Sequence, residues 1–182
     1  NTDYAREVFP TPEPIIMGAT ARVMSLRDGG KKMSKSDSTD MARINLTDDA
    51  DTIANKIKRA TTDSDVLPGP EVLDETGGLP DTARQARPEC YNLLGIHAAL
   101  AGQSWHEVLN QFAGHGFAAF KQALTELAVA KLGGMGDEMK RLLADPAEID
   151  RILADGADRA DRISRPVLDE AMSAVGFLGG AR

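Results

Sequence analysis

The sequence Ala21-Arg22-Val23-Met24-Ser25-Leu26-Arg27-Asp28-Gly29-Gly30-Lys31-Lys32-Met33-Ser34-Lys35-Ser36-Asp37 joins an alternating apolar run, a glycine pair and a basic loop. The partial alternation over residues 21–26 predicts a short strand. The two glycines after it predict a hinge that lets the basic loop move. A lone strand cannot form a sheet, so we expect its partner strands in sequence outside these 182 residues.

The basic residues of this stretch stand out against an acidic chain. The 182 residues hold 21 Lys and Arg and 28 Asp and Glu, a formal net charge of −7 that argues against a nucleic-acid partner. Between Arg22 and Lys35, however, five basic side chains and one acid give a local charge of +4. We therefore interpret the loop either as a solvated basic surface or as an anion-binding site.

The residue types in the loop fit a triphosphate. Lys32 and Lys35 are compact point charges with rotatable donors. The hydroxyls of Ser34 and Ser36 and the backbone N–H groups can surround phosphate oxygens. A P-loop is excluded, because the glycine that this motif needs five positions before Gly30 is replaced by serine.

The rest of the chain predicts connectors and helices. Residues 1–20, which are rich in proline, predict an extended connector, and residues 61–87 predict a long irregular segment. Apolar periodicity, caps and breakers predict six helices: 49–60; 88–100, with Gly102 after its end; a short helix opened by a Ser104 and Glu107 capping box; a helix from Phe117 ended by Gly133-Gly134 and Gly136; a short helix from Asp137; and a helix opened by Asp145-Pro146. A last helix is predicted over Val167–Val175, and Pro166 either begins it or kinks a longer helix.

The composition excludes other classes of protein. Apolar residues make up 42% of the chain, too many for a disordered polymer, and no run approaches the roughly 20 apolar residues that span a membrane. The single Cys90 excludes an internal disulfide framework and a cysteine-rich zinc site, and it favours a reducing cytoplasm. His97, His106 and His115 are nine residues apart, which is not a metal-ligand spacing. We expect no metal site in the protein, and we expect Trp105 to be a packing anchor.

The basic loop carries a resemblance to a known family. Lys32-Met33-Ser34-Lys35-Ser36 is the KMSKS motif of the class I aminoacyl-tRNA synthetases, and its surroundings resemble the bacterial tryptophanyl enzymes. The resemblance covers essentially the whole chain, most densely before residue 66, and the tyrosyl enzymes usually have Phe-Gly in place of Met33-Ser34. It extends over residues 21–26 and four further segments: Ile57-Lys58-Arg59-Ala60-Thr61-Thr62-Asp63-Ser64-Asp65, Asn92-Leu93-Leu94, Gly102-Gln103-Ser104 and Ala174-Val175-Gly176-Phe177.

The resemblance implies a mainly α-helical fold with two parts. Residues 1–65 are expected to form the C-terminal end of a Rossmann-like class I catalytic domain, with a short strand and the KMSKS loop. Residues 66–182 are expected to form a connector and a helical-bundle anticodon-binding domain. The HIGH motif and the tryptophan pocket of the family are missing, so the chain is expected to be the C-terminal half of a longer enzyme.

The resemblance also implies an activity. The family attaches L-tryptophan to tRNA(Trp) with ATP through a tryptophanyl-adenylate and releases pyrophosphate and AMP. Lys32 and Lys35 are expected to be catalytic, with Lys35 our first choice, and ATP is expected to contact Val23 through its backbone, Lys32, Met33, Ser34, Lys35 and Ser36. ATP is expected with Mg²⁺, without a tightly bound cofactor. The full-length enzyme is expected to be a cytoplasmic homodimer, and this chain alone is expected to be inactive.

Individual contacts with tRNA are not assigned from the sequence. Residues 66–88 are longer than in many members of the family, and Pro88-Glu89 stands where many have Gly-Val, so no contact is carried over to this loop. The basic side chains of the second part are candidates: Arg87, Lys140, Arg141, Arg159, Arg162 and Arg165. For most of them the interpretation is a solvated helix face.

Other functions remain open at this point. One is a tyrosyl-type class I synthetase. Another is a non-catalytic helical RNA- or protein-binding module with a vestigial loop, which the intact Lys32 and Lys35 disfavour. A generic ATPase is disfavoured because the sequence has no Walker motif.

Overall fold

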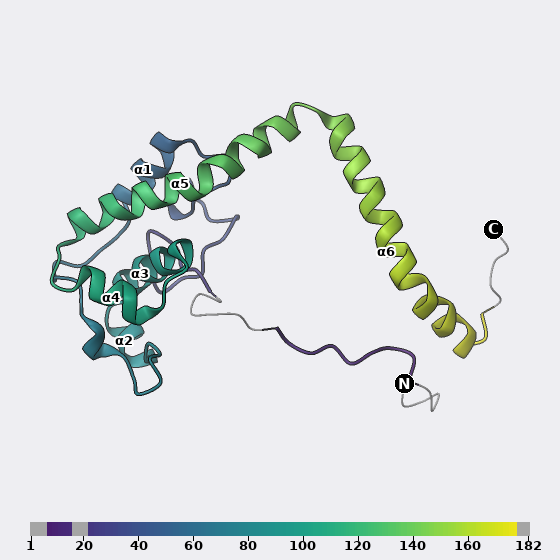
Figure 1. The fold of residues 1–182 in the computed structure, drawn as a ribbon, viewed down its shortest axis with the longest axis horizontal. Coiled ribbons are helices and arrows are strands. Elements are labelled where there is room, and N and C mark those ends of the chain that lie inside the picture. The colour runs from purple at the N-terminus through teal and green to yellow at the C-terminus, as the bar shows by residue number, and fades with distance from the viewer. Residues whose placement is uncertain (1–6, 16–21, 178–182) are drawn as a thin grey trace. The chain divides into compact units, whose positions relative to one another are not determined.

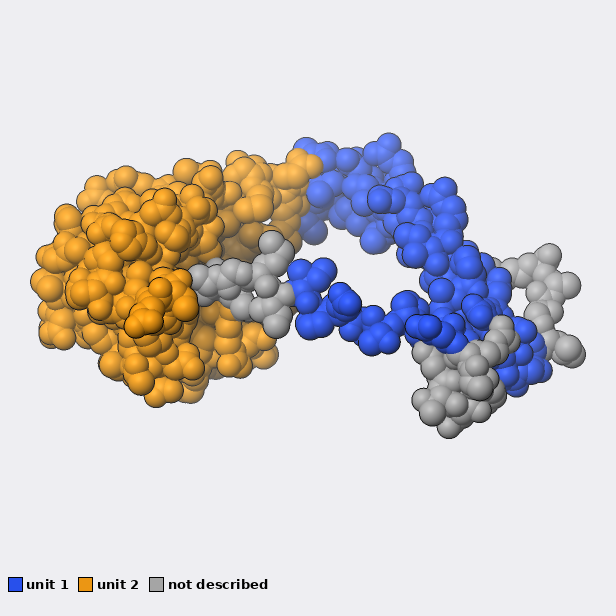
Figure 2. Space-filling model, turned by 60° about the horizontal axis from the view of Figure 1, so that its bottom comes forward, with its two compact units in different colours: residues 1–15, 141–182 blue, residues 16–140 orange. Residues whose placement is uncertain are grey.

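The computed structural model describes residues 7–15 and 22–177, and this part of the chain is mainly helical (Figure 1). Contacts divide it into two compact units, Ile16–Lys140 (unit 2) and Asn1–Ile15 with Arg141–Arg182 (unit 1), which Figure 2 distinguishes by colour. No helix in the described part is long and apolar enough to cross a membrane. The elements are, in order, η2 (Asp40–Ala42), α1 (Ala50–Lys58), η3 (Pro70–Val72), α2 (Asp81–Ala86), α3 (Pro88–Ala101), α4 (Trp105–Phe112), α5 (Phe117–Leu143) and α6 (Pro146–Ala174).

The predicted strand over residues 21–26 does not form in the described residues 22–26. A single antiparallel bridge joins Met24 to Lys32 instead. Two hydrogen bonds flank the bridge: Ser25 N donates to Lys31 O at 2.8 Å, and Met33 N donates to Val23 O at 3.1 Å. The return segment after the glycines supplies one pair only, and a ladder of successive pairs is what makes a strand.

Helix ends set by local sequence are confirmed. The Asp49 side chain accepts a hydrogen bond from Thr52 N at 2.8 Å and caps α1. The capping box that opens α4 is complete, because the Ser104 side chain accepts from Glu107 N and the Glu107 side chain accepts from Ser104 N at 2.8 Å. Helix α3 ends at Gly102 with a φ of 68°, a left-handed conformation that costs glycine little.

The helix break predicted at Gly133, Gly134 and Gly136 is wrong, whereas the break before the helix opened by Asp145-Pro146 is confirmed. Helix α5 runs without a break through the glycines at 133, 134 and 136, and no short helix begins at Asp137. Gly136 meets a close neighbour, since a Cβ there would lie 2.7 Å from the Leu46 carbonyl oxygen. A glycine costs a helix about 1 kcal/mol, which neighbouring helix formers and packing outweigh. Pro166 lies inside α6, so the alternative of one longer helix is the one observed.

The segment 61–87, predicted to be irregular, contains regular structure. Helix α2 covers Asp81–Ala86 and begins after Pro80, and η3 covers Pro70–Val72. The described part of the predicted N-terminal connector, residues 7–15, has no helix, in agreement with its prolines. Residues 1–6 and 16–20 of that connector lie outside the described part.

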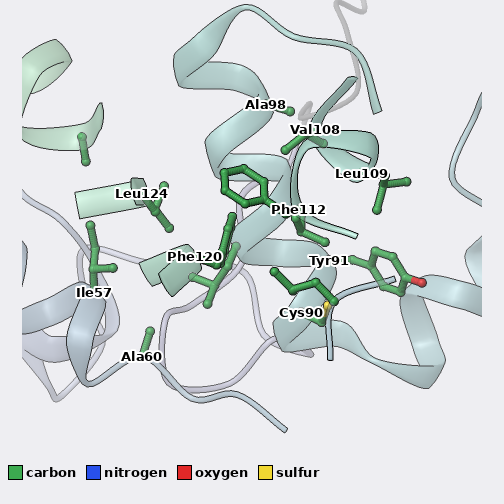
Figure 3. Close-up of a cluster of buried hydrophobic side chains, with 14 of the residues drawn as sticks. Ile57, Ala60, Cys90, Tyr91, Ala98, Val108, Leu109, Phe112, Phe120 and Leu124 are labelled. Carbon is green, nitrogen blue, oxygen red and sulfur yellow. The ribbon is translucent and has the colours of Figure 1, made fainter. Parts of the chain in front are cut away.

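The hydrophobic core of unit 2 is built mainly from α1, α3, α4 and the first half of α5. Its central side chains are Ile57, Leu94, Leu109, Phe120 and Leu124, all 1% exposed or less. Figure 3 shows several of these side chains converging from the helices. The core also includes Leu26, which lies two residues after the bridge residue Met24. The basic loop is therefore attached to a well-packed helical body.

His97 is buried in this core beside two aromatic rings. Its ring centroid lies 4.9 Å from that of Phe112 and 5.9 Å from that of Phe120. Its Nδ1 atom has no hydrogen-bond partner within the described part of the chain. Burial therefore lowers the pKa of His97 below its ordinary value of 6.5.

We expect this histidine to make the fold sensitive to mild acid. Between the lowered pKa of the folded state and about 6.5, the unfolded chain binds more protons, so the free energy of unfolding falls as the pH drops below about 6.5. Urea unfolding followed by the fluorescence of Trp105, the single tryptophan, measures this slope from pH 7 to pH 5. His97→Phe is expected to flatten the slope, whereas replacing the exposed His106 with Phe is expected to preserve it. An equal slope in His97→Phe and in the parent chain would contradict this assignment.

Candidate functional site

The basic loop, residues 30–37, presents two ammonium groups to solvent. Lys32 and Lys35 are both exposed, and neither forms an ion pair with another described residue. Lys31 differs, because its Nζ lies 3.1 Å from Asp28 Oδ2. The hydrogen bond with Lys31 lowers the pKa of Asp28. Two of the three loop lysines are thus available to an anion.

The tip of the loop is a turn held by its serines. The Oγ atoms of Ser34 and Ser36 are 3.0 Å apart, and Ser36 N donates to Ser34 Oγ at 3.3 Å. Asp37 N donates to Ser34 O at 3.4 Å and closes the turn. Both serines are exposed, whereas Met33 is half-buried and packs against the core. Met33 therefore anchors a loop whose polar groups remain accessible.

The segment that precedes the loop, residues 22–26, is called the first leg here and is held against α3. The side chain of Asn92 accepts from Met24 N at 2.9 Å and donates to the carbonyls of Met24 at 3.0 Å and Ser25 at 3.2 Å. Gly29 N donates to Glu89 Oε1 at 3.2 Å. A Cβ at Gly29 would lie 2.6 Å from Glu89 N, so only glycine permits this close approach. Gly29 is buried, which gives it a packing role in addition to the predicted hinge.

The second leg of the loop, residues 37–42, is held by a buried lysine of α1. The Lys56 side chain is 1% exposed, and its Nζ lies 2.6 Å from both Asp40 Oδ2 and Asp48 Oδ2. Burial alone would lower the pKa of Lys56, but the hydrogen bonds to the two carboxylates outweigh it and raise the pKa. Asn45 donates to Asp40 Oδ1 at 2.8 Å, and Arg43 pairs with the same carboxylate at 3.0 Å.

Sequence reasoning missed the structural role of Lys56. A signal was present, because position 56 lies three residues after Ile53 and four before Ala60, on the apolar face of the helix. A lysine at an apolar position, with several aspartates nearby in sequence, indicates a buried ion pair. The side chain of Asp48 is 8% exposed and that of Asp40 is 54% exposed, so the two ion pairs of Lys56 extend from the core to the surface.

A cleft of about 580 Å³ opens beside the first leg. Val23, Met24 and Gly30 line one side, and side chains from α2, α3 and the start of α4 line the other. Trp105 forms part of this wall and is otherwise buried in the core, which confirms that it is a packing anchor. The Arg84 guanidinium lies 5.4 Å from the centre of the Trp105 ring, a distance that suits a cation–π contact. Of the predicted ATP contacts, Val23 is the one that borders this cleft.

The described residues contain no cluster of three or more His, Cys, Asp or Glu side chains that could hold a metal ion. His97 is in the core, and His106 and His115 are exposed. Cys90 is fully buried, and burial raises the pKa of its thiol to about 12, so the reactive thiolate is disfavoured.

Most of the basic candidates for tRNA contact have local partners. Arg87 pairs with Asp63 at 2.6 Å and also donates to the carbonyls of Val66 and Asp65, so it braces the segment before α3. Three further arginines pair within or next to α6: Arg141 with Glu148 at 2.6 Å, Arg159 with Asp155 at 3.9 Å, and Arg165 with Asp161 at 2.7 Å. The partners at Arg87 and Arg141 favour structural roles for these two residues.

Comparison with known proteins agrees with the motif in the loop. The family model described as tRNA synthetases class I (W and Y) matches residues 2–132. Tryptophan–tRNA ligase of Caulobacter vibrioides is 52% identical over 180 residues, which are 98% of this chain and 49% of the relative. Tryptophan–tRNA ligase of Rhizobium meliloti is 51% identical over 170 residues, which are 93% of this chain and 45% of the relative.

A solved structure shares the fold. The crystal structure of tryptophanyl-tRNA synthetase from Mycoplasma pneumoniae superposes with a TM-score of 0.68 at 26% identity, over 88% of this chain and 47% of that chain. The chain thus spans about half the length of the curated relatives that it matches. The match of the family model over more than two thirds of the sequence, together with the KMSKS loop on its helical body, shows that the chain belongs to the class I tRNA synthetases of the tryptophan and tyrosine group.

Proposed function

We propose that this chain is part of a tryptophan–tRNA ligase that joins L-tryptophan to tRNA(Trp) with ATP. The observation that carries the proposal is the pair of exposed ammonium groups of Lys32 and Lys35, unpaired within the described residues, on a loop supported at both legs. The names of the most similar relatives support tryptophan as the amino acid. The complete enzyme is taken to be these 182 residues joined to the sequence that completes the length of such relatives.

In the proposed first step, the tryptophan carboxylate attacks the α-phosphorus of ATP. The bond from this phosphorus to the bridging oxygen breaks, and pyrophosphate leaves with the electron pair of that bond. Negative charge on the leaving group increases as the bond breaks. Lys32 and Lys35 would donate N–H groups to its oxygens and stabilise this charge, and contacts that strengthen in the transition state raise the rate of the step.

The remaining contacts with ATP follow from the same loop. Met33, Ser34 and Ser36 would cover the phosphates, with the exposed hydroxyls as donors. Val23, at the border of the cleft, would approach the adenine with its backbone. ATP would arrive with Mg²⁺, which neutralises part of the phosphate charge. The acceptor for the activated tryptophan would be the 3′ end of the tRNA, and AMP would leave in this second step.

The wider organisation is also a proposal. We place the catalytic part in residues 1–65, as the end of a Rossmann-like domain, and the anticodon-binding part in residues 66–182. The shared core, in which Leu26 and Ile57 contact the same cluster as Leu94 and Phe120, supports close cooperation between the two parts. The complete enzyme would act as a homodimer in the cytoplasm.

Pyrophosphate exchange tests this function. The complete enzyme is expected to exchange labelled pyrophosphate into ATP when tryptophan is present and not when tyrosine replaces it. The 182-residue chain alone is expected to bind ATP weakly and to catalyse no exchange, because it lacks a tryptophan pocket. Exchange that depends on tyrosine would favour the tyrosyl alternative. Binding of tRNA by a complete protein that catalyses no exchange would favour the non-catalytic module.

A further inference from the structure

The position of Lys32 depends on the backbone of the first leg. Met24 and Lys32 are bridge partners, and the hydrogen bonds from Ser25 N to Lys31 O and from Met33 N to Val23 O lie on either side of them. A shift of Met24 therefore moves the backbone from which the Lys32 side chain starts. The backbone N–H and C=O groups of Met24 must therefore also be held in place if Lys32 is to keep its position.

A single side chain, that of Asn92, holds these backbone groups. Asn92, in the second turn of α3, makes three hydrogen bonds of 2.9–3.2 Å to the backbone of Met24 and Ser25. An amide side chain has both the acceptor that Met24 N needs and the two donors that the carbonyls need. Asn92 therefore pairs with the first leg as a neighbouring strand would, although it lies 68 residues away in the sequence.

The surrounding packing makes this link stiff. The backbone at Gly29 lies against the start of α3, where Glu89 accepts a hydrogen bond from Gly29 N. Four residues on from Glu89, Leu93 is 1% exposed in the core, next in sequence to Asn92. Helix α3 is thus fixed to the core on one face and to the base of the loop on another.

We propose that Asn92 is a positioning residue for Lys32: it transmits the placement of α3 to the phosphate-binding lysine through the backbone of Met24. The role rests on the proposed function, because Lys32 must act on ATP for its placement to affect a rate. Asn92 itself does not act on the reacting atoms. Its hydrogen bonds connect α3 directly to the segment that precedes the loop.

Four variants test the role in the complete enzyme. Asn92→Ala removes all three hydrogen bonds. Asn92→Asp keeps the shape and the acceptor of the side chain but loses both donors. Asn92→Gln keeps the donors and the acceptor, and the cleft beside this position has room for its additional methylene group. Asn110→Ala is the matched control, since this exposed asparagine of α4 contacts His106 and not the loop. Urea unfolding is measured for each variant.

We expect Asn92→Ala and Asn92→Asp to lower kcat for pyrophosphate exchange by about 10- to 100-fold, because this is the usual effect of losing a group that orients a functional side chain. The KM for ATP is expected to change by less than about threefold. Asn92→Gln is expected to recover most of the loss, and Asn110→Ala to match the parent enzyme. Unchanged kcat in Asn92→Ala and Asn92→Asp would overturn the proposal. Equal losses in Asn92→Gln and Asn92→Ala would also overturn it.

A second measurement uses the 182-residue chain and does not need activity. Trypsin should cleave Asn92→Ala after Lys31, Lys32 and Lys35 at least about threefold faster than the parent chain, while cleavage after Arg159 in α6 stays the same, because local opening exposes backbone to proteases. Equal cleavage of the loop in both chains would overturn the proposal. If the parent complete enzyme catalyses no exchange with tryptophan, the proposed function fails, and the trypsin result still decides whether Asn92 holds the loop.

Discussion

Replacing Lys35 with alanine in the complete enzyme is expected to slow tryptophan-dependent pyrophosphate exchange by about 100- to 1,000-fold, or roughly 3–4 kcal/mol of barrier, the usual cost of one donor to transition-state charge. The ammonium of Lys35 is exposed and has no ion-pair partner in the described residues, so no protein charge competes with the leaving pyrophosphate. Its contact should strengthen as the bond to pyrophosphate breaks. The affinity for ATP in the ground state should therefore change little.

The split between kcat and KM for ATP checks this role. A lysine that acts only in the ground state would raise KM and leave kcat unchanged. Lys131→Ala is the matched control, because it removes the same charge from an exposed position on α5, and it is expected to keep the parent rate. An exchange rate constant that is unchanged in Lys35→Ala would show that this lysine is not catalytic.

Replacing Lys56 with methionine is expected to lower the free energy of unfolding of unit 2 by about 3 kcal/mol, the lower end of the cost of removing one partner of a buried pair. The variant leaves Asp48 in a nearly buried position without its cation. Methionine keeps most of the length and apolar surface of the lysine stem, so the loss reports mainly on the charge. Urea unfolding followed by the fluorescence of Trp105, which lies in the same core, measures it.

Two further variants separate the ion pair from other effects. Lys58→Met, two residues on and exposed, is expected to change the free energy of unfolding by less than about 0.5 kcal/mol. Combining Lys56→Met with Asp48→Asn removes both charges and should recover a large part of the loss, since the main cost is an unpaired buried charge. A Lys56→Met protein as stable as the parent would mean that the pair makes no net contribution to stability.

For the basic loop, the sequence predicts the candidate functional side chains and does not predict the residues that support them. The motif at residues 32–36 identifies the candidate lysines, and the structure places both at the surface without ion pairs in the described part. The supports of the loop were not predicted. Asn92 is 68 residues from Met24 in the sequence. Gly29 was predicted as part of a hinge, and it also packs against the start of α3, where a Cβ would lie 2.6 Å from Glu89 N.

The ends of the helices likewise include some that the sequence predicts correctly and some that it does not. Ser104 and Gly102 predict helix ends correctly, because a cap acts on backbone groups only three or four residues away. The glycines of α5 predict a break from local preference, yet the helix continues through them. Pro166 allowed either a new helix or one longer helix, and α6 is the longer helix. Local preferences of about 1–3 kcal/mol decide a helix only where long-range packing and neighbouring residues do not oppose them.

The sequence alone predicts the residue types of the basic loop, the caps at the start of α4 and the end of α3, and the KMSKS motif that carries the family resemblance. Each of these depends on residues within a few positions of one another. Three features became visible in the three-dimensional structure: the burial of Lys56 between two carboxylates, the three hydrogen bonds of Asn92, and a single bridge in place of the predicted strand. These features depend on which distant segments meet. Their free energies come from burial and pairing across the fold, and the local pattern of the chain does not contain that information.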